Sequence, residues 1–144
     1  MLVYTHKIIP PQPPESEDGN TEYKIYLTPN YETRKNRRQP KSEKIKKMWF
    51  QNYIQNKSTQ LLFRLLEGNG KALYLLGIED NGKVRGMNSQ EMYLSLENIR
   101  LMAKQIGAKI RIIRVYKGGR GHVCSVRLYL PDSIYHQKVK NSII

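Results

Sequence analysis

The amino-acid sequence predicts an α+β fold: a ferredoxin-like split βαβ sheet in the order β-α-β-β-α-β, with one further C-terminal strand and a basic insertion. Strand-like and helix-like apolar patterns alternate between residues 22 and 130, and one helix carries cap signals at both ends. The 144 residues suffice for one hydrophobic core. We expect a single domain over residues 21 to 131, with helices covering one face of the sheet and the other face open.

The N-terminal part begins with a segment that resembles a tail. Residues 1 to 20 contain four prolines and an acidic stretch and show no apolar period, which predicts a flexible, proline-rich tail. Residues 22 to 28 alternate apolar and polar side chains, as a half-buried strand does. Pro29 ends this strand. At the other end of the chain, we expect residues 132 to 144 to form a C-terminal tail.

The insertion, residues 29 to 57, differs in composition from the rest of the chain. It holds nine Lys or Arg residues against two Glu residues, with aromatic side chains among them. We interpret it as a basic arm, with room for a helix from Ser42 onward. Ser58 is then a candidate cap for a short helix that runs through Glu67, because leucines recur at helical spacing before Gly68.

The central part predicts a hairpin followed by a helix. Residues 71 to 78 form an apolar run of strand length, the turn at residues 80 to 82 has the sequence Asp-Asn-Gly, and a short strand over residues 83 to 86 should follow. Asn88 and Glu91 have the spacing of a capping box. The apolar face of the helix is predicted at Met92, Leu96, Ile99, Ala103 and Ile106, and Gly107 ends it.

Two strands, residues 108 to 116 and 122 to 130, complete the predicted sheet, and a glycine-rich turn joins them. Simple alternation sends Ile110 and Ile112 toward the core, with Cys124 and the other apolar residues of the last strand. The same alternation places basic and aromatic side chains on the opposite, open face, namely Lys109, Arg111, Arg127 and Tyr129, joined by Lys24 and Tyr26 of the first strand.

The charge of the chain indicates its class of partner. Lys and Arg number 25 against 12 acidic residues, a formal net charge of +13, so a polyanion is expected. No apolar run approaches the roughly 18 residues of a membrane helix, and the N-terminus shows no hydrophobic signal core, so we expect no membrane partner. The single cysteine, Cys124, favours a reducing compartment, and we predict a cytoplasmic location. These features together indicate binding to structured RNA.

The candidate RNA-binding residues lie in three places. Cations neutralise phosphates, and aromatic rings stack on unpaired bases. The three groups are the arm (Arg34, Lys35, Arg37, Arg38, Lys41, Lys44, Lys46, Lys47 and Trp49), the open sheet face (Lys109, Arg111 and Arg127) and the glycine-rich turn (Lys117 and Arg120). For each group a structural alternative stays open: a solvated insertion, an ordinary solvent-facing sheet, and a plain hairpin connection. The turn is expected to be mobile, with glycines that let phosphate approach the backbone.

The sequence predicts neither catalysis nor a cofactor. Cys124 belongs to the apolar set of its strand, so a core thiol is expected rather than a nucleophile paired with His122. The three histidines are scattered, with no ligand spacing for a metal. Glu79 and Asp80 lie at a turn, where paired acids are usually solvated.

The most specific pattern is a family resemblance. Residues of the form EGxGxAxYxxGxEDNGxxxG occur from Glu67 to Gly86, and MAxxxGAxIxxxR occurs from Met102 to Arg114. With residues 22 to 28, these blocks resemble the region preceding the GTPase domain in the elongation-factor-like proteins called GTP-binding protein one and two. Because the chain stops at Ile144, GTP hydrolysis is not expected to carry over, and GTP is not expected as a partner.

As a separate chain, the domain also resembles the microsporidian dormancy factors found at the tRNA exit site of inactive ribosomes. That resemblance implies a ribosome hibernation factor that binds rRNA at the exit site, contacts ribosomal proteins of both subunits, competes with deacylated tRNA and blocks translation without catalysis. Two alternatives stay open: an RNA-binding adaptor in mRNA decay or ribosome quality control, and a small hydrolase acting on RNA or peptidyl-tRNA.

Overall fold

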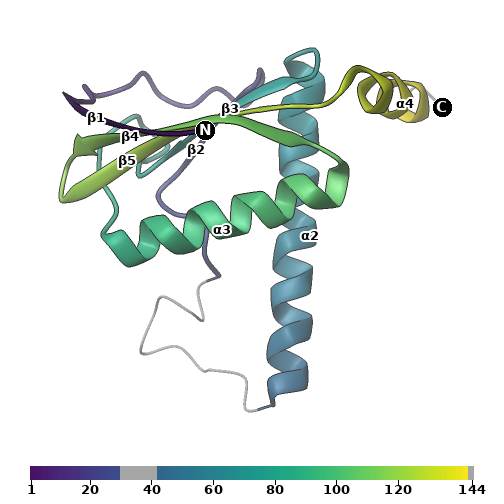
Figure 1. Ribbon diagram of the computed structural model, residues 1–144, viewed down its shortest axis with the longest axis horizontal. Helices are drawn as coiled ribbons and strands as arrows, with labels where there is room; N and C mark the ends of the chain where they lie inside the picture. Colours follow the sequence, from purple (N-terminus) through teal and green to yellow (C-terminus); the bar gives the residue numbers. More distant parts are fainter. Residues whose placement is uncertain (30–41, 143–144) are drawn as a thin grey trace.

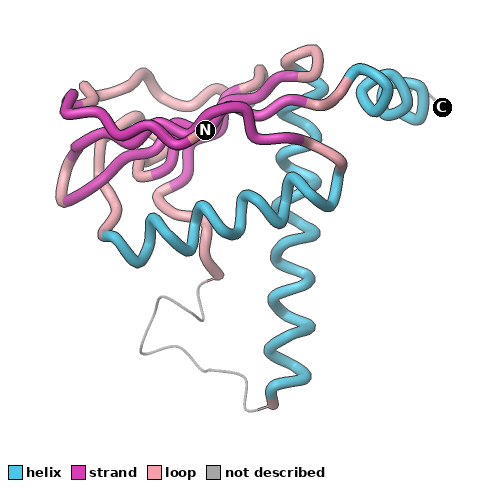
Figure 2. The backbone as a smooth tube through the Cα atoms, viewed as in Figure 1, coloured by secondary structure: helices cyan, strands magenta, loops and turns pink. Residues whose placement is uncertain are grey.

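The computed structural model describes residues 1 to 29 and 42 to 142, which form one sheet with helices packed on it (Figures 1 and 2). The elements in chain order are β1 (Leu2–Ile8), β2 (Thr21–Lys24), α2 (Glu43–Glu67), β3 (Lys71–Leu76), α3 (Ser89–Ile106), β4 (Lys109–Gly118), β5 (Gly121–Tyr129) and α4 (Asp132–Ser142). The five strands lie in the order β1-β4-β5-β3-β2. Among the described residues, no helix is both long and apolar enough to span a membrane.

The predicted fold class is confirmed: this is a mixed α+β fold, compatible with a split βαβ arrangement. β5 pairs antiparallel with both β4 and β3, while the edge strands β1 and β2 pair parallel with β4 and β3. The main core lies between the sheet and helices α2 and α3, where Leu61, Leu65, Ile99 and Met102 are fully buried against the strands. Among the described residues, the opposite sheet face has a smaller apolar cluster, around Tyr23 and Val123.

The segment before β2 differs from the flexible tail that its composition predicts. β1 pairs with β4 through backbone hydrogen bonds, and most of its side chains remain exposed. An edge strand of this kind buries no face, so it leaves no clear alternation in the sequence. The residues that follow are fixed as well, since Gln12 N–H donates to Gly82 O at 2.9 Å and Glu15 N–H to Asp80 O at 2.7 Å.

The predicted short helix capped by Ser58 is instead the second half of one long helix. α2 begins after Ser42, and the side chain of Ser42 accepts from Ile45 N–H. Ser58 is buried in mid-helix, where its hydroxyl donates to Ile54 O at 2.7 Å. A serine tolerates a helix interior when its hydroxyl bonds the carbonyl one turn earlier, and this contact satisfies Ser58 without a cap. Figure 1 shows the N-terminal half of α2 extending past α3, away from the sheet.

The predictions for α3 are confirmed. Asn88 and Glu91 form the capping box, and Gly107 ends the helix in the left-handed conformation, with φ 75°. Leu96, Ile99 and Ala103 are buried, while Met92 and Ile106 pack against the edge of the core.

Two smaller elements also differ from prediction. The expected strand over residues 83 to 86 is reduced to a single bridge between Ile78 and Val84, although the turn before it forms as predicted. The C-terminal segment forms helix α4, whose Tyr135 packs against the core. Both elements depend on neighbours distant in sequence, so local pattern was a weak guide to them.

Candidate nucleic-acid interface

The sheet face opposite the helices carries the basic side chains of the strands. In register, Lys71 of β3 pairs with Tyr129 of β5, and Arg114 of β4 pairs with Ser125 of β5. Paired residues point to the same face, so the alternation of three neighbouring strands brings Lys71, Arg114 and Arg127 to this one surface.

A β-bulge in β4 changes the expected alternation. Ile110 pairs with Leu128, but Ile112 pairs with Arg127, so Arg111 is an extra residue on β4. The bulge turns Ile112 onto the open face, where it is half-buried, and the prediction that it faces the core with Ile110 is wrong. Ile113 takes the core position and is buried.

These side chains surround a hollow of about 450 Å³, which we call the basic hollow. Four cationic side chains line it, Lys71, Arg111, Arg114 and Arg127, and none of the described residues lines it with a carboxylate; the other lining residues are Met1, Asn20, Ala72, Ile112, Leu128 and Tyr129. Four like charges around one concavity repel one another and attract an anionic ligand.

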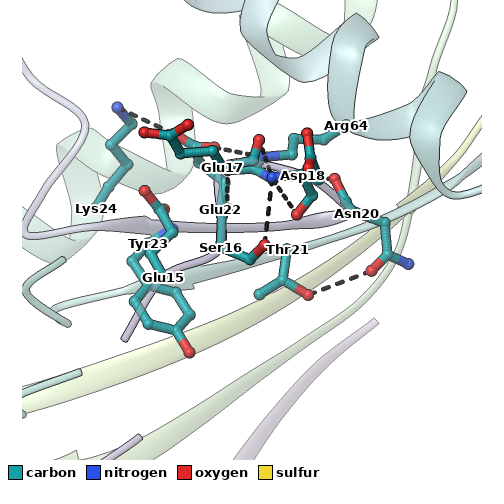
Figure 3. Close-up of polar contacts among 11 residues, drawn as sticks. Glu15, Ser16, Glu17, Asp18, Asn20, Thr21, Glu22, Tyr23, Lys24 and Arg64 are labelled. Carbon is teal, nitrogen blue, oxygen red and sulfur yellow. Dashed lines mark hydrogen bonds and ion pairs between the residues drawn. The ribbon is translucent and has the colours of Figure 1, made fainter. Parts of the chain in front are cut away.

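An ion-pair cluster holds the loop before β2 (Figure 3), and Asn20 of this loop is one of the residues that line the basic hollow. Arg64 of α2 is only 4% exposed, and its Nε donates to Glu22 Oε2 at 2.6 Å. Its two terminal nitrogens donate to four consecutive carbonyls, those of Ser16, Glu17, Asp18 and Gly19, at 3.0 to 3.4 Å. One guanidinium thus holds the backbone of the loop that leads into β2.

Glu15 adds a second contact to the same loop. Its carboxylate accepts a short hydrogen bond from Tyr23 N–H, and Tyr23 Oη donates to Pro13 O at 2.9 Å. Burial raises the pKa of Glu15, and the nearby carboxylates Glu22 and Asp80 raise it further, although the Tyr23 bond and Arg64 oppose this. The acidic stretch is therefore part of the packed domain.

The structure places the predicted sheet residues in different surroundings. Arg111 and Arg127 line the basic hollow, as the open-face prediction required. Lys109 pairs with Tyr129 and so belongs to the same face by register, but it lines a different hollow, near the end of α3 with Lys104. Lys24 departs from the predicted open face, because it pairs with Leu76 and binds Glu22 on the helix side. Tyr26 lies beyond the end of β2, beside Tyr53 of α2.

Sequence reasoning missed Lys71 and Arg114. Lys71 begins an apolar run that looked like a fully buried strand. Lys71 is nevertheless exposed and Ala72 is buried, as a polar residue followed by an apolar one at the start of a strand would predict. Arg114 was missed because its side depends on the bulge, which only pairing with β5 reveals.

The turn residues Lys117 and Arg120 are exposed, but the turn is not a free loop. Arg120 N–H donates to Arg85 O at 3.0 Å, and a Cβ added at Gly119 would lie 2.1 Å from Arg85 O. The glycines therefore allow close approach of the protein's own backbone, in place of the phosphate that the sequence suggested.

The arm residues divide into two groups. Arg34, Lys35, Arg37, Arg38 and Lys41 lie outside the described residues. Lys44, Lys46, Lys47 and Trp49 lie on the exposed N-terminal end of α2, and Trp49 is 43% exposed. These residues form a second basic surface, separate from the basic hollow.

The described residues offer little for covalent chemistry. Cys124 is fully buried, and burial raises the pKa of its thiol to about 12, which keeps it protonated at neutral pH. No group of three or more His, Cys, Asp or Glu side chains that could hold a metal occurs within residues 1 to 29 and 42 to 142.

Comparison with known proteins relates this chain to part of a longer protein. The chain is homologous to a region of GTP-binding protein 2. The mouse and human proteins are each 37% identical to it over 102 residues, which cover 71% of this chain but 14% of each relative. The chain thus spans only a small part of the length of these relatives. No family model matches the sequence.

This homology corrects the predicted set of partners and confirms part of the predicted family resemblance. The predicted partner set, with the ribosome included and GTP excluded, is wrong as stated, because the relatives that carry this region are GTP-binding proteins by name. The predicted resemblance to the region of GTP-binding protein 2 is confirmed. The further resemblance to microsporidian dormancy factors stays a prediction.

Proposed function

We propose that this domain binds structured RNA, without catalysis, through the basic hollow on the open face of its sheet. The observation that carries the proposal is the convergence of Lys71, Arg111, Arg114 and Arg127 on one concavity, which no carboxylate lines in the part of the chain that the structure describes. Arginine is well suited to phosphate, since its planar guanidinium donates two parallel hydrogen bonds.

The second basic surface favours a polymer over a small anion. Lys44, Lys46 and Lys47 are exposed on the end of α2 that extends past α3, away from the sheet (Figure 1). A small anion occupies one surface only, whereas an RNA stem or loop is long enough to contact both. Tyr129, 37% exposed at the edge of the basic hollow, offers a ring for an unpaired base.

The test is a fluorescence-anisotropy titration of a labelled RNA hairpin at several salt concentrations. The variants Arg111→Ala and Arg127→Ala should each weaken binding, and each should reduce the slope of log affinity against log salt by about 0.7 to 0.9. The matched control is Lys104→Ala, which removes an exposed cation of α3 that lies outside the basic hollow. Equal losses from all three variants would mean that charge alone, and not this surface, governs binding.

The dormancy function goes beyond what the basic hollow supports and stays a prediction, as does the alternative of an adaptor in mRNA decay or quality control. Both include RNA binding, so the hairpin titration is the first test for either. A protein that does not bind the hairpin at low salt would contradict both.

A further inference from the structure

A second hollow, of about 440 Å³, lies between the end of β2 and the middle of α2. We call it the lysine hollow; its lining is Lys24, Tyr26, Leu27, Thr28, Pro29, Tyr53, Asn56 and Lys57. It is distinct from the basic hollow. Lys24 pairs with Leu76 at the far end of β3 from Lys71, a separation of about 17 Å along the strand, and it points to the helix side.

The lysine hollow contains more positive than negative charge. One carboxylate, Glu22, serves both Arg64 Nε at 2.6 Å and Lys24 Nζ at 3.3 Å. Within the described part of the chain, no carboxylate lies within ion-pair distance of Lys57, whose ammonium stands 5.7 Å from the centre of the Tyr53 ring. Burial lowers the pKa of Lys57, and the neighbouring Lys24 lowers it further, while Glu22 opposes this.

Two buried hydroxyls lack a hydrogen-bond partner within the described part of the chain, and one of them lines the lysine hollow. Thr28 lines the lysine hollow, is 4% exposed, and its Oγ1 has no partner among the described residues. Tyr74 Oη, fully buried on β3, is likewise without one. Burial raises the pKa of this hydroxyl, and the nearby charge of Glu22 raises it further. A buried hydroxyl without a partner is costly, so such groups often mark a site where a ligand completes the bonding.

We propose that the lysine hollow binds a phosphate group, with Lys24 and Lys57 as its two cationic donors and Asn56 and Thr28 as neutral donors. A phosphate group carries about 1.5 to 2 negative charges near neutral pH, so it suits a site with two ammonium groups. The rings of Tyr26 and Tyr53 form the remaining wall, and the volume exceeds that of a bare phosphate. The ligand class is therefore inorganic phosphate or a small phosphomonoester. This site is independent of the RNA-binding proposal.

The test is a titration of inorganic phosphate into the ¹⁵N-labelled protein at low ionic strength, followed by NMR. We expect saturable shifts at the amides of Thr28 and Asn56 and a rise in the pKa of Lys57 when phosphate binds. Lys57→Met keeps the aliphatic stem and removes the charge, and it should weaken binding by about tenfold or more, as expected for a charge-assisted contact. Asn56→Ala, at an exposed position, provides a second variant should Lys57→Met fold poorly.

The control variant is Lys44→Met, which removes an exposed cation of the same helix outside the lysine hollow. Shifts that never saturate, or equal affinity in Lys57→Met and the control, would overturn the proposal. Tighter binding of uridine monophosphate than of inorganic phosphate would assign a nucleotide; equal binding would assign inorganic phosphate. Arg111→Ala should leave the phosphate titration unchanged, so failure of one proposal is distinguishable from failure of the other.

Discussion

Arg64 joins the helix layer to the loop before β2, and it does so from a buried position. In the sequence, Arg64 stands among the leucines of α2. An arginine on an apolar helix face is seldom buried unless it is paired, so this position was a signal of a buried ion pair. The acidic residues that accompany it looked like a solvated tail. Their partner is distant in sequence, so local composition could not reveal the contact.

Arg64→Ala should lower the free energy of unfolding by about 3 to 5 kcal/mol, since it leaves Glu22 without its buried partner and four carbonyls without a donor. Urea denaturation measures this. The control is Arg100→Ala, whose ion pair with Glu97 is about half exposed and should contribute under about 1 kcal/mol. Equal effects would show that the Arg64 cluster is not structural.

Glu15→Gln tests the electrostatics of the same loop. A raised pKa means that the folded state holds the proton of Glu15 more tightly than the unfolded state does, whose value is near 4.5. The protonated carboxyl of Glu15 therefore makes its full contribution to the free energy of unfolding below pH 4.5. That contribution is lost as the pH rises through the folded-state pKa. The Tm of the Gln variant should fall less across that interval than the Tm of the unmodified protein. Thermal melts from acidic to neutral pH measure this. An identical pH profile for both proteins would contradict the assignment.

At the scale of elements, long regular patterns were predictable and contacts between distant segments were not. α3 follows from its capping box and its apolar face, both of which are local. β1 was missed because most of its side chains remain exposed, and the bulge at Arg111 was missed because the register of β4 depends on its pairing with β5. Of the four cationic residues that line the basic hollow, Arg111 and Arg127 were predicted from the sequence. The places of Lys71 and Arg114 could be seen only in the assembled sheet.

The β4–β5 turn gives a prediction at this scale. Gly119 has φ 55°, and an added Cβ would lie 2.1 Å from Arg85 O, so Gly119→Ala should strain the backbone and displace the segment that it packs on. We expect a loss of about 1 to 3 kcal/mol by chemical denaturation. Gly19→Ala is the matched control, because its φ is also positive but no atom lies within 4 Å of the added Cβ. A loss at Gly119 no larger than at Gly19 would exclude the contact with Arg85.

For the molecule as a whole, the net charge of +13 leads us to expect that the affinity for RNA depends strongly on salt concentration. We predict that replacing Arg34, Lys35, Arg37 and Arg38 with Ala weakens RNA binding and leaves Tm nearly unchanged, because these residues are not among the predicted elements of the domain. The slope of log affinity against log salt should fall by up to about 3, since each phosphate contact contributes about 0.7 to 0.9. A large drop in Tm would show that the arm is part of the folded domain.

Both edges of the sheet are built from the first 24 residues, with β1 on β4 and β2 on β3. The partner of β1 lies far along the chain, with Leu2 opposite Ile113, whereas β5 follows β4 directly. Closing the β1–β4 loop therefore costs more entropy than any other strand pairing in the sheet. During refolding β1 should therefore join the sheet last, with the edge of β4 still bare. Bare strand edges pair readily with other chains. β1 covers this edge once it has paired, but the edge is open to other chains during folding, so refolding yield should fall as protein concentration rises.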